Sequence, residues 1–139
     1  MKIEEHKKAY EEHKENIDRF IEESIEKNQR NLGYNISQGS IELFAIYLHK
    51  LYLIQGSGDQ FDHRTFKSKN LTEKKIPPDF PAKKEILELM KDIETKRNSL
   101  CYGSRKPKER IEISIKNFQK LRKIINDELK KAKGKNAKK

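Results

Sequence analysis

The sequence contains a single cysteine, no tryptophan, six glycines and four prolines in 139 residues. One cysteine excludes both an internal disulfide and a thiolate metal cluster, as is typical of proteins from a reducing compartment. No apolar run is long enough to span a membrane, because the densest one, residues 43–54, is short and is interrupted by Lys50. The first residues also lack the basic and then apolar layout of a signal peptide. We therefore expect a cytoplasmic protein with no membrane contact.

The chain is too short for a second independent core, so we expect one domain. Hydrophobic residues make up 33% of it and charged residues 39%. Such a chain can build a core only from elements that each bury one apolar stripe, which favours amphipathic helices.

Apolar residues recur with helical spacing in four segments, residues 2–28, 35–54, 82–101 and 107–130. These segments predict an all-α domain over residues 1–130. Pro77, Pro78 and Pro81 prevent a long helix from starting before residue 82, so the second and third helices are joined by a long irregular loop. Loops of this length are usually functional or disordered. The second segment is apolar around most of its circumference, which predicts homodimerisation through that helix.

Positive charge is concentrated at the C-terminus, since residues 103–139 carry 14 basic and 4 acidic side chains and the rest of the chain is balanced. We expect residues 131–139 to form a basic, disordered tail. Two interpretations are open, namely contact with a polyanion such as nucleic acid and a lysine-rich solvated surface.

An arginine interrupts the apolar stripe of the third predicted helix. Ile86, Ile93, Arg97 and Leu100 are spaced by seven, four and three residues, which places Arg97 on the core side. A buried permanent charge needs a partner. One interpretation is structural, with the arginine head reaching solvent or pairing with a carboxylate such as Glu94. The other is a guanidinium that binds a phosphate bidentately in a cleft between helices.

The run from Arg97 to Gly103, Arg-Asn-Ser-Leu-Cys-Tyr-Gly, resembles the signature of the HEPN superfamily of small helical domains. That signature is an arginine, commonly followed by a polar residue, with a histidine after four to six intervening residues. The resemblance implies an up-and-down four-helix bundle that dimerises so that two motifs face one cleft. It also implies binding of RNA or nucleotides and, in many members, metal-independent ribonuclease activity. Several such members act in toxin–antitoxin or defence systems with nucleotidyltransferase-like partners.

By this resemblance Arg97 corresponds to the family arginine and Asn98 to the polar residue after it. Tyr102 stands at the first position that the histidine can occupy, and Arg105 follows closely. The resemblance gives Arg97 and Tyr102 catalytic roles, and we expect Asn98 and Arg105 to bind phosphate. A tyrosine is a poor general base near neutral pH, because its phenol ionises at a reference pKa of about 10.

A substitute base is available in the long loop, where Asp62, His63 and Arg64 lie between two phenylalanines. Imidazole titrates near neutrality, so His63 is our candidate for a third catalytic residue. Arg64 and the nearby lysines are candidate RNA contacts, and the phenylalanines could stack on bases. The alternative is a structural loop anchor, with both phenylalanines packed on the helices and with Asp62 and His63 bonded to nearby backbone groups. The two phenylalanines are Phe61 and Phe66, and the nearby lysines are Lys67 and Lys69.

The histidines outside this loop lack metal-ligand spacing, so we expect no metal site and no cofactor. The sequence therefore predicts an HEPN-like domain that binds RNA or nucleotides and that could cleave RNA without a metal. The competing hypothesis is a non-catalytic interaction module that pairs with a nucleotidyltransferase-like protein.

Overall fold

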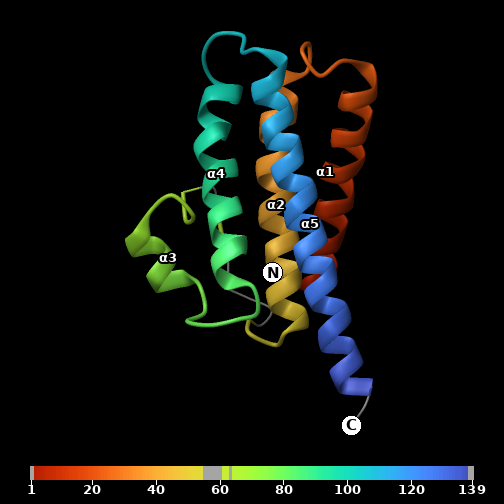
Figure 1. Ribbon diagram of the computed structural model, residues 1–139, viewed down its shortest axis with the longest axis vertical. Coiled ribbons are helices and arrows are strands. Elements are labelled where there is room, and N and C mark those ends of the chain that lie inside the picture. The colour runs from red at the N-terminus through yellow and green to blue at the C-terminus, as the bar shows by residue number, and fades with distance from the viewer. Residues whose placement is uncertain (1, 55–60, 63, 138–139) are drawn as a thin grey trace.

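The computed structural model describes residues 2–54, 61–62 and 64–137, and all regular secondary structure in these ranges is helical. The helices are α1 (Ile3–Glu23), α2 (Gln29–Lys50), α3 (Lys69–Lys75), α4 (Lys83–Cys101) and α5 (Lys108–Ala137). The predicted all-α fold class is confirmed. The four long helices lie side by side and run in alternating directions, whereas α3 lies in the connection between α2 and α4 (Figure 1). Within the described residues, no helix is long and apolar enough to cross a membrane.

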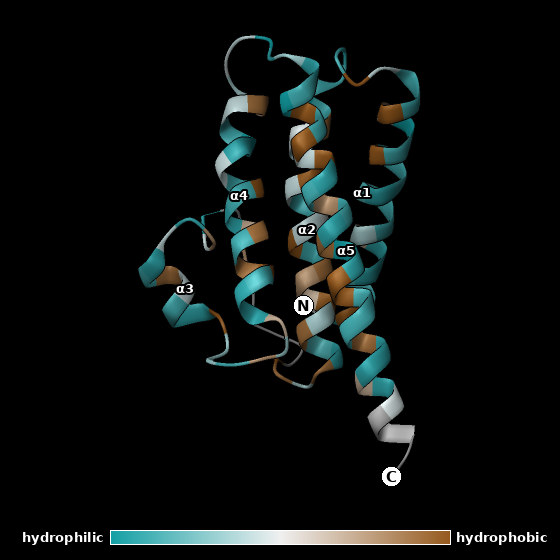
Figure 2. Cartoon of the chain, in the orientation of Figure 1, coloured by the Kyte–Doolittle hydropathy of each residue, from teal (hydrophilic) through white to brown (hydrophobic). Residues whose placement is uncertain are grey.

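α2 is the central helix of the fold. It packs against α1, α4 and α5, and most of its residues are buried. Figure 2 shows the apolar positions of the surrounding helices turned towards it. The broad apolar surface of this helix, from which we predicted homodimerisation, is therefore covered within a single chain.

α1 ends earlier than its apolar spacing predicted. We expected the helix to reach residue 28, but its last residue is Glu23. The side-chain amide of Asn28 donates hydrogen bonds to the carbonyl oxygens of Phe20 (3.3 Å) and Ser24 (3.0 Å). These bonds satisfy carbonyls at the helix end that lack an intrahelical partner, so the chain can turn there.

α2 begins at Gln29, six residues before the predicted start at residue 35. Gln29 is fully buried, and its amide donates to the carbonyls of Leu100 (3.1 Å) and Ser104 (3.3 Å) while its oxygen accepts from the Lys106 N–H (2.7 Å). A Cβ at Gly33 would lie 2.7 Å from the Leu100 Cβ, so only glycine fits this approach of α2 to α4. The start of the helix is thus set by long-range contacts rather than by an apolar pattern.

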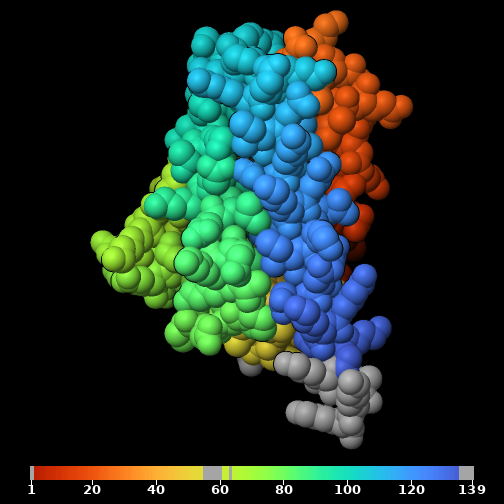
Figure 3. Space-filling model, viewed as in Figure 1, coloured from red at the N-terminus to blue at the C-terminus, as the bar shows by residue number. Residues whose placement is uncertain are grey.

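Three phenylalanines of the long connection pack around one residue of α2. The ring centroids of Phe61, Phe66 and Phe80 lie 5.5, 5.5 and 5.6 Å from that of Phe44, distances typical of favourable aromatic pairs. The loop-anchor interpretation is therefore confirmed for Phe61 and Phe66. Figure 3 shows the segment that contains α3 resting against the side of α4.

Two further predicted boundaries differ from the structure. The connection that we expected to be irregular contains α3, which is capped by Ser68, whose hydroxyl accepts a hydrogen bond from the Leu71 N–H (3.2 Å). α5 continues to Ala137, past residue 130, where the basic tail was expected to begin.

Candidate functional site

Arg97 lies on the buried stripe of α4, as its spacing predicted. Only 8% of the residue is exposed, and its guanidinium carbon is 6.0 Å from the ring centroid of Tyr34 on α2. The Nε atom is buried and has no hydrogen-bond partner. No carboxylate of the described residues lies within 4.0 Å of the guanidinium, so the ion pair with Glu94, one option of the structural interpretation, does not form. Arg97 is a nearly buried cation without an ion pair among the residues described.

Glu94 lies one turn before Arg97 and is completely buried. Both of its oxygens are within hydrogen-bond distance of the Ser37 hydroxyl on α2, at 2.8 and 2.9 Å. Burial raises the pKa of this carboxyl to about 7, although the Ser37 hydrogen bond and the positive charges of Arg97 and Lys67 oppose the increase. The structure thus brings a cation and an easily protonated acid together between α2 and α4.

The cluster formed by Tyr34, Ser37, Glu94 and Arg97 is the candidate site. The sequence prediction contained Arg97 and considered Glu94 only as its partner. Tyr34 and Ser37 were missed because nothing in the sequence pairs them with α4. The available signal was their spacing of three residues, which places both on one face of α2 within the uncharged run of residues 31–41.

The residues after Arg97 lie at the end of α4 and are more exposed. Asn98 is exposed, and its carbonyl accepts the Tyr102 N–H at 3.0 Å. Tyr102 itself is 66% exposed. Arg105 was predicted to bind phosphate, but its guanidinium donates to the carbonyls of Glu26 (2.9 Å) and Lys27 (3.4 Å). Arg105 is therefore engaged in holding the α4–α5 loop against the turn between α1 and α2.

Of the candidate site residues in the long loop, His63 lies outside the described residues, and Arg64 and Lys67 differ in their partners. Arg64 is paired with Asp62, whose carboxylate lies 3.2 Å from the guanidinium and also accepts the Arg64 N–H at 2.8 Å. This Asx-type turn agrees with the predicted structural role of Asp62. Lys67, by contrast, forms no ion pair with the described residues, and it acts electrostatically on Glu94. The structure therefore places Lys67, but not Arg64, in the electrostatic surroundings of the candidate site.

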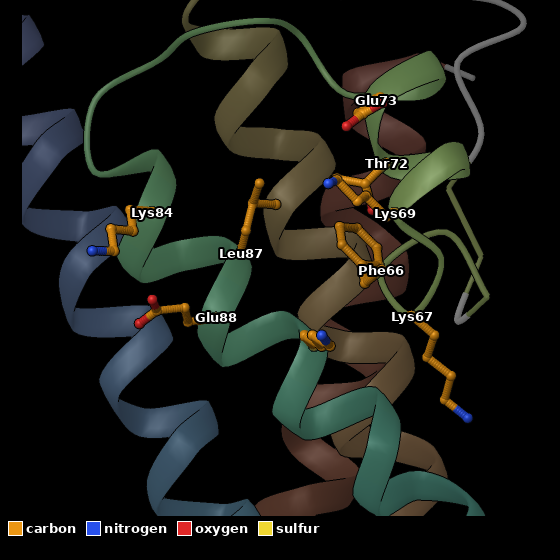
Figure 4. Close-up of a pocket in the computed structure, with 9 residues that line it drawn as sticks. Phe66, Lys67, Lys69, Thr72, Glu73, Lys84, Leu87 and Glu88 are labelled. Atoms are coloured by element: carbon orange, nitrogen blue, oxygen red, sulfur yellow. The ribbon is translucent and has the colours of Figure 1, made fainter.

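Lys67 and Lys69 also line a groove of about 440 Å³ between the α3 segment and α4 (Figure 4). Phe66 and Leu87 supply its apolar wall, and lysines and two glutamates surround it. The charged residues of the groove are Lys67, Lys69, Glu73, Lys84, Glu88 and Lys91. The mixture of charges makes this groove a weaker anion site than a surface that carries cations alone.

The described residues contain no group of three or more His, Cys, Asp or Glu side chains that could hold a metal ion. Comparison of the chain with known protein families, curated proteins and solved structures finds no match.

Proposed function

We propose that this chain is an HEPN-like up-and-down four-helix bundle that binds RNA or nucleotides and uses Arg97 to bind a phosphate. The observation that carries the proposal is the Arg97 guanidinium, nearly buried and without an ion pair among the described residues. The buried Nε donor of Arg97 has no acceptor among the described residues, and a buried donor without an acceptor is unfavourable, so an anionic ligand explains this position better than stability does. A phosphate would supply the missing acceptors in the bidentate geometry that guanidinium groups favour.

Tyr34 gives the site a second property that suits a nucleotide. Its ring faces the Arg97 guanidinium and is 47% exposed, so one part of the ring contacts the cation while another part remains open to solvent. An exposed aromatic face can stack on a base of any sequence. Lys67 adds a positive charge that acts on Glu94, so the site combines base stacking with phosphate binding.

Binding can be tested by replacing Arg97. We expect Arg97→Ala to weaken binding of single-stranded RNA about tenfold or more, because hydrogen bonds to charged groups contribute roughly 1.5–3 kcal/mol. Arg97→Lys keeps the charge but loses the planar fork, so its affinity should be intermediate. Fluorescence anisotropy with labelled RNA at fixed salt measures the effect. The matched control is Arg19→Ala, which removes an exposed arginine from α1. Equal affinities of Arg97→Ala and wild type would instead favour the interaction module.

Cleavage is a separate expectation that follows from the family resemblance. If the protein cleaves RNA, products should end in 2′,3′-cyclic phosphate and should form in the presence of a chelator, because a ribose hydroxyl attacks the adjacent phosphorus without a metal. Arg97→Ala should abolish the activity, since the developing phosphate charge loses its main partner. His63→Ala should reduce the rate more than Tyr102→Phe, because imidazole accepts protons near neutrality. Gel analysis of end-labelled RNA reports each rate.

Two results would contradict this mechanism, namely cleavage that survives Arg97→Ala and cleavage that requires a divalent metal. The resemblance also implies that two copies share one cleft. A monomeric mass by light scattering at micromolar concentration would exclude that arrangement and leave RNA binding as the function of the domain.

A further inference from the structure

We infer that the other end of α2 carries a second contact for single-stranded RNA, in which Tyr52 stacks on a base and Lys50, Lys130 and Lys133 bind phosphates. The inference rests on the proposed function for the identity of the ligand. It concerns a site separate from Arg97, because Tyr34 is near the beginning of α2 and Tyr52 follows its end. The two tyrosines are separated by 18 residues, or about 27 Å along a helix.

Tyr52 occupies a backbone position that normally favours glycine. α2 ends at Lys50 with Leu51 as its C-cap, and Tyr52 has a φ angle of 59°. The Tyr52 N–H donates to the His49 carbonyl (3.0 Å) and the Leu53 N–H donates to the Leu48 carbonyl (2.9 Å). These two bonds define a Schellman motif, whose left-handed residue is usually glycine because a Cβ is unfavourable there.

The Tyr52 side chain does not compensate for this unfavourable backbone by packing. The residue is 87% exposed, the highest value among the large apolar residues that are exposed. Neither helix termination nor core formation therefore explains a tyrosine at this position. A residue in a disfavoured conformation that packs on nothing is evidence for a role in binding.

Tyr52 borders a cavity of about 530 Å³ between the end of α2 and the last turns of α5. The other described residues that line the cavity are Lys50, Asn126, Leu129, Lys130, Ala132 and Lys133, and none of them is acidic. It therefore combines an aromatic face with three cations. This combination is typical of surfaces that bind single strands, where bases stack on aromatic rings and lysines neutralise the backbone.

The sequence of α5 separates its charges onto two faces near this cavity. Asn126, Leu129, Lys130 and Lys133 follow helical spacing and line the cavity. The acidic residues lie on another face, where Asp127 pairs with Lys123 (3.0 Å) and Glu128 with Lys131 (3.3 Å). Lys130 and Lys133 form no ion pair with the described residues. The cavity face therefore keeps uncompensated positive charge although acidic residues lie close by on the same helix.

The decisive variant is Tyr52→Gly, measured by anisotropy with a labelled oligouridine longer than the roughly 16 nucleotides that one single-strand site occupies. We expect its affinity to fall about fivefold or more, because stacking on an aromatic ring contributes about 1–3 kcal/mol per base. Glycine suits the left-handed position, so the melting temperature should stay unchanged or rise. Loss of affinity therefore cannot be ascribed to unfolding. Tyr52→Phe retains the ring and should bind like wild type.

Inorganic polyphosphate, which has charge but no bases, separates stacking from electrostatics. Tyr52→Gly should leave the affinity for polyphosphate unchanged, whereas the double variant Lys130→Gln/Lys133→Gln should lower the affinity for both RNA and polyphosphate. The double variant should also reduce the slope of log affinity against log salt by about 1.4 for RNA. Lys123→Gln/Lys131→Gln is the matched control, because it removes two lysines of the same helix that do not line the cavity and that are paired with Asp127 and Glu128. Equal losses in the two double variants would overturn the assignment of the cavity face.

Other outcomes distinguish this contact from the Arg97 site. If Tyr52→Gly binds RNA like wild type while Arg97→Ala is impaired, the second contact is wrong and the proposed function stands. The reverse pattern would retain the Tyr52 contact and exclude Arg97 as the phosphate ligand. If Tyr52→Gly loses affinity for RNA and for polyphosphate equally, Tyr52 does not act by stacking on a base. Tighter binding of polyglutamate than of RNA, lost in Tyr52→Gly, would identify an acidic protein segment as the ligand and overturn the proposal.

Discussion

Phe44→Ala should destabilise the protein by about 3–5 kcal/mol, the range for truncating a buried phenylalanine. Phe44 is completely buried on α2, and its ring contacts Phe61, Phe66 and Phe80. The substitution removes one large side chain from the core and also the common partner of three aromatic residues in the connection. Urea denaturation followed by far-ultraviolet circular dichroism measures the loss, which is a large share of the 5–15 kcal/mol typical of a domain.

A second measurement shows whether Phe44 anchors the connection specifically. Phe118 on α5 is buried to nearly the same degree but contacts none of these three rings in the described structure. Phe118→Ala should therefore lose similar stability, whereas only Phe44→Ala should accelerate tryptic cleavage after Lys67 and Lys69 under native conditions. Identical cleavage patterns in the two variants would show that the connection is held by other contacts.

Glu94→Gln should make the protein more stable than wild type above neutral pH. The Glu94 carboxyl has a pKa of about 7 in the folded protein, against 4.5 for an unperturbed glutamate, because burial disfavours its charged form. The folded state therefore binds this proton more tightly than the unfolded state. Its contribution to stability is complete below about pH 4.5 and is lost as the pH rises to about 7, by about 3 kcal/mol in total.

Thermal or urea denaturation of both proteins from about pH 4.5 to 8 tests this expectation. Wild type should lose stability across that interval relative to Glu94→Gln, and the difference should level off above neutral pH. Glu88→Gln, on an exposed position of the same helix, is the control and should follow the wild-type profile. Parallel profiles for wild type and Glu94→Gln would show that Glu94 does not change its protonation between the folded and unfolded states.

The features that could be predicted from the sequence are those that depend on spacing along one helix. The core position of Arg97 followed from its distances to Ile86, Ile93 and Leu100, and the extent of α4 followed from the same pattern. The prolines and the loss of helical spacing among apolar residues correctly predicted that a long connection separates α2 from α4. For the aromatic residues of the polar connection, the sequence left base stacking and a loop anchor open, and the structure shows Phe61 and Phe66 packed on Phe44.

The features that could not be predicted depend on contacts between distant segments. Ser37 and Glu94 are 57 residues apart in sequence, and no pattern within either helix shows that they meet. Arg105 was predicted to bind phosphate from its type and its position near the motif, and no sequence pattern showed that its guanidinium would also donate to backbone carbonyls of the α1–α2 turn. The early start of α2 was missed for the same reason, since the partners of Gln29 lie on α4 and in the α4–α5 loop, more than 70 residues further along the chain.

The close approach at Gly33 has a further consequence for how affinity could change over evolution. Gly33 precedes Tyr34 directly, and its missing side chain lets α2 meet α4 at Leu100, one turn beyond Arg97. Any larger residue would push the two helices apart and increase the separation between the Tyr34 ring and the Arg97 guanidinium. Position 33 therefore sets the width of the proposed site and leaves no room for a side chain. If the proposed function holds, even Gly33→Ala would weaken ligand binding, although every charged and aromatic group of the site would still be present.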